Sequence, residues 1–243
     1  MDCMEMDYTG EVIFARNDVT KFKVKQKINI NDIFLNLIFC NVTDNCLLLD
    51  IGTGNGFVLS QISEKTGKQV QLYGVDNSEE MVKIAKKNLE GKAKILQADI
   101  NNLPFDNNNF NVVTAKNVTR INASEIFRVL KDGGVFIFRE YGYGKGLVEV
   151  VKLFNNRIIR QRNPKYYVKN LTEAGFIITK FKQFKIFRKY NSAQELISIV
   201  KSFPLIQDFS IADETKILKR FEKDATITSD PFILVANKIK GGK

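Results

Sequence analysis

Short apolar runs alternate with amphipathic segments along most of this chain. Runs that are typical of buried strands lie at about 46–50, 70–75, 93–97, 110–115 and 135–138. Segments whose apolar residues recur at helical spacing lie between them, at about 55–65, from Asn77 and from Asn122. Repeated strand–helix units predict a parallel sheet that is covered by helices on both faces and joined by right-handed crossovers.

Two of these helices are predicted to begin with a capping residue. Asn77 is followed by Glu80, and Asn122 by Glu125, at the spacing that is typical of helix N-termini. In the helix after Asn77, the expected buried stripe consists of Met81, Ile84, Ala85 and Leu89.

The C-terminal part of the chain continues the pattern. A helix with Pro164 at its start and Gly175 at its end precedes a sixth strand at about 176–183. Two amphipathic helices follow within residues 191–223, and Ser192 is the expected cap of the first. The last predicted strand covers residues 231–236.

The N-terminal residues have a weaker pattern. Residues 21–28 alternate lysine with apolar residues, which is the periodicity of a strand with one basic face. This segment is predicted to be an edge strand or an extended arm. From Asn31 the spacing of apolar residues predicts a helix that leads into the first strand of the sheet.

Composition narrows the classes of protein that this chain can belong to. Its 243 residues suffice for one large domain, and the 44% hydrophobic and 26% charged content is that of an ordinary globular chain. No apolar stretch approaches the ~20 residues that span a bilayer, and the N-terminus lacks a signal-peptide core, so we expect no membrane partner. The three cysteines, Cys3, Cys40 and Cys46, form no C-x-x-C pair, which favours the cytoplasm and argues against structural zinc.

The chain contains no histidine. This removes both the most common metal ligand and the most common general base, so no metal site is predicted and proton transfer needs another group. The net charge is +10 and the pI is about 9.4, which suits an anionic partner such as nucleic acid. A lysine-rich composition with solvated lysines explains the charge equally well. Nothing in the sequence indicates an oligomeric state.

The segment 47–56 carries the most specific chemical signal. An apolar strand ends at Asp50 and is followed by glycines at alternate positions, Gly52, Gly54 and Gly56. Glycine permits a tight turn and allows a ligand to lie against bare backbone. Asp76, at the end of the second strand, is placed to accept hydrogen bonds from two ribose hydroxyls, as in a dinucleotide site. The glycine spacing differs from the dinucleotide fingerprint, and a tight turn without a ligand is the alternative.

This segment resembles motif I of the class I S-adenosylmethionine-dependent methyltransferases, in particular the type 11 methyltransferases. Further downstream, Asp99 follows the third strand, where this family has an acid that binds the adenine amine. Residues 103–113 are similar to the family's LPF…FDVV segment, with Asn111 in place of the usual aspartate. Residues 128–134, RVLKDGG, resemble its RVLKPGG turn. Together these matches cover roughly residues 46–140.

The resemblance implies an α/β fold. It is a Rossmann-like, seven-stranded, mostly parallel sheet with an antiparallel last strand, helices on both faces and a helical insert between strands six and seven. We expect a single methyltransferase domain over residues 1–243. It would have an N-terminal extension at 1–40, a cofactor-binding core at 46–140 and a lid insert at 191–223. The alternative for the insert is that its helices simply pack on the sheet.

The resemblance also implies S-adenosyl-L-methionine as the cofactor. The residues expected to bind it are Asp50, Gly52, Thr53, Gly54, Asn55, Gly56, Asp76, Asn77, Met81, Ala98, Asp99, Ile100 and Lys116. In this arrangement the glycine segment holds the methionine end, Asp76 holds the ribose, and Asp99 with its two neighbours holds the adenine.

The methyl acceptor is expected to approach over the carboxyl ends of the strands. Asn117, Glu140 and Tyr141 are the candidate catalytic residues, with Glu140 as a general base or a group that binds a cationic acceptor. Residues 139–146 interleave glycines with tyrosines and are predicted to form a mobile, ligand-sized loop, although a solvent-exposed connection is the alternative. Cys40 and Cys46 are interpreted as packing residues beside the first strand, not as nucleophiles.

The predicted function is an enzyme, a methyltransferase that moves a methyl group to an O, N, C or S atom of a small-molecule acceptor by in-line displacement. Much of the acceleration can come from alignment, so the lack of histidine does not exclude it. One alternative is an RNA or protein methyltransferase that uses the basic surface. Another is a non-catalytic scaffold with the same fold.

Overall fold

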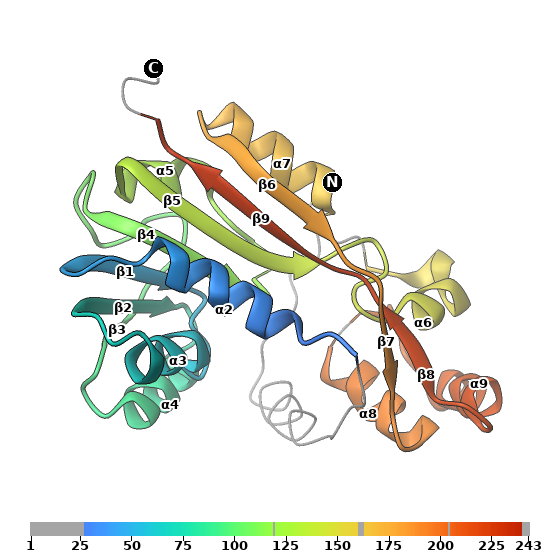
Figure 1. Cartoon of the computed structure of the whole chain (residues 1–243). Helices are drawn as coiled ribbons and strands as arrows, with labels where there is room; N and C mark the ends of the chain where they lie inside the picture. The colour runs from blue at the N-terminus through green and yellow to red at the C-terminus, as the bar shows by residue number, and fades with distance from the viewer. Residues whose placement is uncertain (1–26, 119, 160–162, 204, 240–243) are drawn as a thin grey trace. The chain divides into compact units, whose positions relative to one another are not determined.

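The computed structural model describes residues 27–118, 120–159, 163–203 and 205–239 (Figure 1). These residues form two compact units. The larger unit comprises the described residues of Ile30–Glu140, Arg162–Gln183 and Phe232–Lys243. The smaller unit comprises those of Met1–Asn29, Tyr141–Gln161 and Phe184–Pro231.

A seven-stranded sheet forms the centre of the larger unit, in the order β3-β2-β1-β4-β5-β9-β6 (Figure 1). Its strands are β1 (Cys46–Ile51), β2 (Val70–Asp76), β3 (Lys94–Gln97), β4 (Phe110–Lys116), β5 (Leu130–Tyr141), β6 (Ile177–Gln183) and β9 (Pro231–Asn237). The pairs β3–β2, β2–β1, β1–β4 and β4–β5 are parallel, whereas β9 runs antiparallel to β6. The predicted fold class, including the antiparallel last strand, is therefore confirmed.

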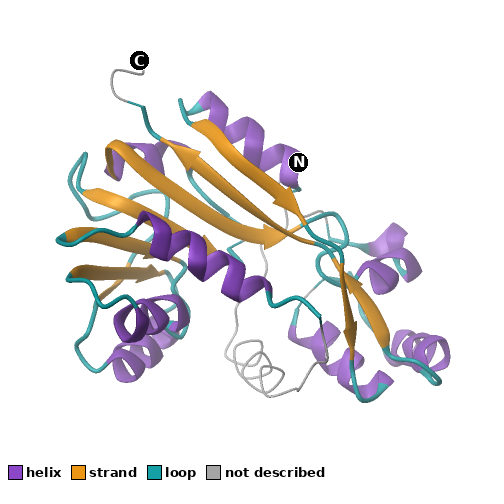
Figure 2. Ribbon diagram, viewed as in Figure 1, coloured by secondary structure: helices purple, strands orange, loops and turns teal. Residues whose placement is uncertain are grey.

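Five helices cover this sheet on both faces, as Figure 2 shows. They are α2 (Ile30–Asn41), α3 (Phe57–Lys65), α4 (Glu79–Leu89), α5 (Ala123–Val129) and α7 (Pro164–Glu173). On one side α2 packs against α3 and β4, and α4 packs against α3, β2 and β3; on the other, α5 packs against α7, which lies on β6. The parallel strands lie between these layers, and β1 and β4 are accordingly almost wholly buried.

The smaller unit contains a two-stranded antiparallel ribbon and short helices. Its elements are α6 (Val148–Leu153), the 3-10 turn η1 (Asn155–Arg157), β7 (Ile186–Lys189), α8 (Ala193–Ser202), α9 (Ile211–Phe221) and β8 (Thr226–Ser229). The two predicted insert helices correspond to α8 and α9. The ribbon was not predicted, because each strand has only four residues and lacks a clear alternation. The single-domain organisation and the lid role of 191–223 stay predictions.

Several local predictions are confirmed. Asn122 caps α5 by accepting from the Glu125 backbone N–H at 3.1 Å, and Ser192 caps α8 by accepting from Glu195 N–H at 3.3 Å. The helix that begins at Pro164 ends just before Gly175, which has a φ of 100°.

Other local predictions are wrong. The cap of α4 is Ser78, whose hydroxyl accepts from Met81 N–H, because Asn77 still belongs to the turn after β2. The predicted buried stripe of α4 is confirmed at Ala85 and Leu89 and wrong at Met81 and Ile84, which are half-buried, while Val82 is buried as well.

Two further differences follow from tertiary pairing. β5 begins at Leu130, earlier than predicted, because Leu130 pairs with Phe110 of β4, and Gly133 and Gly134 exchange backbone hydrogen bonds with Lys238. Cys40 is exposed on α2 and does not pack beside β1, whereas Cys46 is buried there. Most of the predicted basic strand at 21–28 lies outside the described residues. In the described ranges no helix is long and apolar enough to cross a bilayer.

Candidate functional site

The turn after β1 requires glycine at three positions for two different reasons. Gly52, Gly54 and Gly56 have φ values of 63°, 55° and 83°, in the left-handed region that side chains disfavour. A Cβ on Gly52 would lie 2.5 Å from a Val118 methyl, and one on Gly56 would lie 2.9 Å from Leu89. Beside Gly54, no described atom lies within 4 Å of the Cβ position. Packing therefore explains two of these glycines, while Gly54 borders open space that a ligand can occupy.

Asp76 joins this turn to the start of α4. Its Oδ2 accepts from the Gly54 backbone N–H at 2.9 Å, and its Oδ1 accepts from Ser78 N–H at 3.0 Å. Each carboxylate oxygen has capacity for another hydrogen bond. The half-buried carboxylate thus shapes the turn and keeps acceptor capacity for a ligand beside Gly54.

Asp50 lies beneath the turn and is only 1% exposed. Its Oδ1 accepts from the Thr114 hydroxyl at 2.7 Å, which links β1 to β4. Burial raises the pKa of Asp50 to about 6, against the opposing effects of the Thr114 and Thr53 hydroxyls and the Lys116 charge. This carboxylate is buried and bonded to Thr114. Direct contact between Asp50 and the methionine end of a cofactor therefore stays a prediction.

Three other predicted cofactor residues near this turn, Thr53, Asn55 and Lys116, each contact a neighbouring strand or helix. Thr53 is buried and donates its backbone N–H to Val75 O at 2.9 Å. Asn55 is exposed, and its carbonyl accepts from the Asn88 side chain at 2.9 Å. Lys116 ends β4 with its Nζ 4.8 Å from the centre of the Phe57 ring, at the start of α3.

The residues predicted to bind adenine follow β3. Ala98 donates its backbone N–H to Asp76 O at 3.0 Å, so this segment adjoins the end of β2. Asp99 is exposed, and its Oδ1 accepts from both the backbone and the side-chain amide of Asn101, at 2.9 and 3.0 Å. Ala98 and Ile100 are half-buried on either side. Asn101 was not singled out from the sequence, although its position two residues after an aspartate is typical of an Asx turn.

Asn77 and Met81 lie at the start of α4. Asn77 is exposed, and its carbonyl accepts from the Gln97 side chain at 3.0 Å, which ties the ends of β2 and β3 together. Met81 is half-buried in the first turn of the helix. The structure thus gathers the predicted cofactor residues at the carboxyl ends of β1, β2, β3 and β4.

Two of the candidate catalytic residues lie at the neighbouring strand ends of the larger unit. Asn117 follows β4, is exposed and has a φ of 58°. It donates its backbone N–H to Arg139 O at 2.9 Å, and its side-chain oxygen accepts from the Arg139 guanidinium. Arg139 and Glu140, at the end of β5, are only 2% and 6% exposed. Sequence reasoning missed Arg139, whose role depends on its pairing with β4.

Tyr141, the third candidate, belongs to the smaller unit and begins a loop that Asp230 holds in place. Asp230 accepts from Gly144 N–H at 2.6 Å and from Gly146 N–H at 2.8 Å through its two carboxylate oxygens. Its carbonyl accepts from Gly142 N–H at 2.9 Å. Burial raises the pKa of Asp230, although the two N–H groups oppose this. Asp230 was not predicted, and no local motif marks it.

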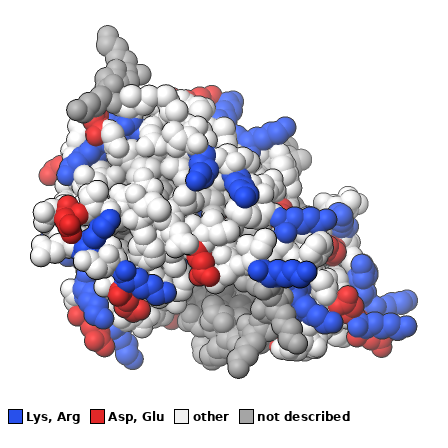
Figure 3. All heavy atoms as spheres, viewed as in Figure 1, with Lys and Arg blue, Asp and Glu red and all other residues white. Residues whose placement is uncertain are grey.

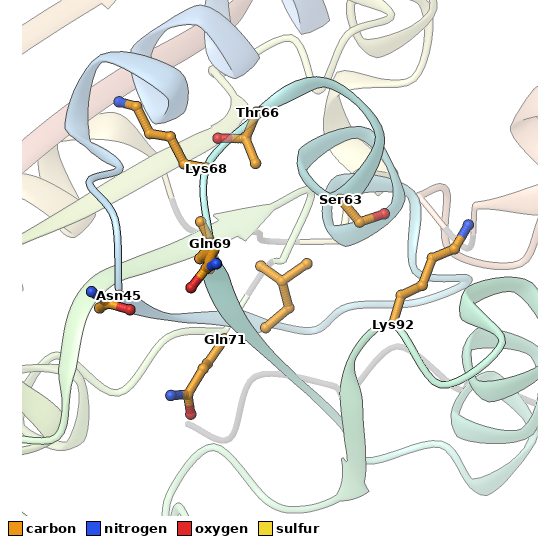
Figure 4. A pocket seen from close by; sticks show the side chains of 9 residues that line it. Asn45, Ser63, Thr66, Lys68, Gln69, Gln71 and Lys92 are labelled. Carbon is orange, nitrogen blue, oxygen red and sulfur yellow. The ribbon is translucent and has the colours of Figure 1, made fainter.

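A depression of about 400 Å³ lies at the other end of β1 and β2, away from the glycine turn (Figure 4). Its lining is mostly polar and consists of Asn45, Ser63, Thr66, Lys68, Gln69, Val70, Gln71, Leu72 and Lys92. Lys68 donates to Val42 O at 2.6 Å. None of the predicted cofactor residues lines it, so it is separate from the candidate site.

A sequence model of the family described as "Methyltransferase domain" matches residues 42–221. The ubiquinone/menaquinone biosynthesis C-methyltransferase of Idiomarina loihiensis is 32% identical over 105 residues, which are 39% of this chain. The chain spans 42% of that relative's length.

Solved structures of similar fold include the YcgJ protein of Bacillus subtilis. It has a TM-score of 0.64 and 18% identity, over 86% of this chain and 100% of that one. The phosphoethanolamine N-methyltransferase 2 of Haemonchus contortus, in complex with S-adenosyl-L-methionine, has a TM-score of 0.60 and 19% identity, over 96% of this chain and 58% of that one. At these identities the likeness shows the fold.

Proposed function

Because the chain belongs to the methyltransferase domain family, we propose that it transfers a methyl group from S-adenosyl-L-methionine to a small-molecule acceptor. The observation that carries this proposal is the hydrogen bond between Gly54 and Asp76 beside open space. It unites a bare backbone segment with a carboxylate that has acceptor capacity left, which is what a ribose with two hydroxyls needs.

The residues present fit this cofactor. Gly54 offers an unobstructed approach, Asp76 offers acceptors for the ribose hydroxyls, and Asp99 offers one for the adenine amine. Ala98 and Ile100 provide apolar surface on either side of Asp99. When bound, the cofactor supplies a methyl group on a positively charged sulfur. The protein's contribution is to fix its orientation, and alignment of reactants can lower a barrier by ~7–11 kcal/mol in the best intramolecular cases.

The acceptor is proposed to contact Asn117 and Glu140, at the carboxyl ends of β4 and β5, together with Tyr141, which follows in the chain. The Arg139 guanidinium donates to the Asn117 side-chain oxygen and so orients this side chain. The C-methyltransferase relative is named for ubiquinone and menaquinone biosynthesis. This name supports an acceptor with a quinone-like ring, on which a carbon atom takes the methyl group.

A second candidate acceptor is RNA, which the charge of +10 favours. α7 and the strand that follows it, β6, carry two exposed aromatic rings, Tyr166 and Phe181. They also carry four lysines close to these rings in the sequence, Lys165, Lys169, Lys180 and Lys182. Figure 3 shows basic side chains, with few acidic ones, over the part of the larger unit where Figure 1 places these elements. Lysines interleaved with exposed aromatic rings are the combination that binds single-stranded nucleic acid.

Calorimetric titration with S-adenosyl-L-methionine tests the proposal. We expect binding by the wild type and a loss of at least about tenfold, roughly 1.4 kcal/mol, in Asp76→Ala. Asp76→Asn, which keeps one acceptor for the Gly54 N–H, separates loss of the ribose contact from loss of the turn. Glu173→Ala, an exposed charge change on α7, is the matched control and should bind like the wild type.

The same titration separates the candidate acceptors. Binding of bulk RNA that falls steeply with salt, and that raises cofactor affinity, would favour RNA; its absence would favour the small molecule. A folded wild type that does not bind the cofactor would contradict the proposal and leave the non-catalytic scaffold.

A further inference from the structure

The ribbon of the smaller unit places an arginine on its core-facing side. In the β7–β8 pair, Ile186 lies opposite Ser229, and Arg188 lies opposite Ile227. Residues directly opposite each other, and those two positions along, share one face of a ribbon. Ile186 and Ile227 are 2% and 0% exposed, so this face points into the core of the unit. The half-buried Arg188 is therefore directed inward, where an arginine needs specific partners.

Two tyrosines provide such partners. Burial lowers the pKa of Arg188, but electrostatic attraction to Tyr141 and Tyr190 and hydrogen bonds with their side-chain oxygens outweigh this, and the pKa lies above its usual value. A guanidinium has five N–H donors in a planar fork and is suited to bidentate binding of an anion.

The position of Tyr141 is set by the glycine loop. A Cβ on Gly146 would lie 2.7 Å from the Tyr141 ring, so the ring rests directly on glycine backbone. The Gly146 N–H is in turn held by Asp230. This loop thus fixes the Tyr141 ring against its backbone, and Tyr141 remains half-buried and accessible.

A buried hydroxyl lies on the same face of the ribbon. Ser229 is 0% exposed, and among the described residues its Oγ has no hydrogen-bond partner. A buried polar atom without a partner is costly, and most such atoms in proteins find one. Ser229 and Arg188 occupy diagonal positions of the pair, which are ~7–8 Å apart and within reach of long side chains or a shared ligand.

We propose that Arg188, Tyr141, Tyr190 and Ser229 form a binding site within the smaller unit for an anionic group, a carboxylate or phosphate. The site supplies one fixed positive charge and three hydroxyls that can donate to the anion's oxygens.

Side-chain NMR of the arginine Nε–Hε groups tests the site directly. The probes are inorganic phosphate and benzoate, titrated against sodium chloride at matched ionic strength. We expect a saturable shift of the Arg188 signal, identified by its absence in Arg188→Lys. The relative response to the two probes tells phosphate from carboxylate. No saturable shift with either probe, or an equal shift with chloride, would overturn the proposal and leave Arg188 as a tie between β7 and Tyr141.

The variants lie within β7 or directly after it. Arg188→Gln should abolish anion binding, and Tyr190→Phe, which keeps the ring, should weaken it. Lys189→Gln removes a charge from the opposite, exposed face of β7 and should leave binding unchanged. An equal loss in Lys189→Gln would mean non-specific attraction and contradict the site. Tyr190→Phe keeps the test informative if Arg188→Gln does not fold.

Cofactor calorimetry on the same samples separates this proposal from the proposed function. Arg188→Gln should bind S-adenosyl-L-methionine like the wild type, because the predicted cofactor residues lie in the larger unit. Anion binding without cofactor binding would retain the anion site and reject the function. Cofactor binding without anion binding would retain the proposed function and reject the anion site.

Discussion

The carboxylate of Asp76 accepts a hydrogen bond from the backbone of Gly54, 2.9 Å away and 22 residues earlier in the chain. This bond joins the ends of β1 and β2, the two strands whose sequence patterns are most specific. Gly54 therefore has two roles: its N–H donates to the acid, and its bare Cα borders open space that a ligand can occupy.

The three glycines of this turn should respond differently to alanine. Gly54→Ala adds only the cost of a left-handed φ, about 1–2 kcal/mol, whereas Gly52→Ala adds a clash with Val118 as well. We therefore expect Gly52→Ala to be the less stable in urea unfolding. Gly54→Ala should instead show the greater loss of cofactor affinity relative to its stability loss. Equal stability in the two variants would contradict the packing argument.

Asp50 should make the stability of the protein depend on pH. Its pKa in the fold, about 6, lies above the usual 3.8, so its stabilising contribution is complete below the lower value. That contribution is lost as pH rises through about 6, by on the order of 3 kcal/mol. Asp50→Asn keeps an oxygen for Thr114 and should flatten this part of the profile.

Urea unfolding at several pH values between 4 and 8 measures this effect, with those values chosen to bracket the raised pKa of about 6. The same change at an exposed position, Asp44→Asn, is the control and should leave the profile as in the wild type. A wild type whose unfolding free energy does not fall between about pH 4 and 6 relative to Asp50→Asn would contradict it.

Asp230 should control the order of the glycine loop. In Asp230→Ala, the buried N–H groups of Gly144 and Gly146 lose their acceptors, at about 1–3 kcal/mol for each buried donor left unpaired. Asp230→Asn keeps one acceptor oxygen and should lose less. Hydrogen exchange at residues 142–147 reports the change, and Asp224→Ala, at an exposed site, should show none.

Substitutions of Asn117 should differ in stability for two separate reasons, the acceptor that the side chain offers to Arg139 and the left-handed φ of the backbone. Asn117→Asp keeps an acceptor for the Arg139 guanidinium, Asn117→Gly keeps only the left-handed φ, and Asn117→Ala keeps neither. We expect stability to fall in that order, with Gly to Ala differing by about 1 kcal/mol. Thermal unfolding measures it, and a glycine variant less stable than the alanine variant would show that the φ does not matter there.

The order of strands and helices could be predicted because it is encoded over short distances. Apolar runs, caps such as Asn122 and the glycine turn are each complete within about one helical turn or strand of sequence. Predictions failed where a choice between neighbours depended on another strand. Ser78 and not Asn77 caps α4, and β5 starts early because Leu130 pairs with Phe110 of β4.

The clustering of the predicted cofactor residues at one edge of the sheet was predictable for a similar reason. Gly54, Asp76 and Asp99 each follow a parallel strand, and parallel strands bring their carboxyl ends to one edge of a sheet. Asp230 and Arg188 could not be predicted in this way. Asp230 lies 86 residues from Gly144, and neither its own segment nor the glycine loop indicates the contact.

The sequence by itself determined the fold class, the family resemblance and the residues that follow each strand, because local periodicity and glycine spacing suffice for these. Only the tertiary structure decided that Asp50 is buried beneath the turn, that Asp230 orders the loop after β5, and that Arg188 faces inward between two tyrosines. Burial, hydrogen-bond partners and pKa shifts depend on what distant segments place around a side chain, and a linear pattern does not contain that information.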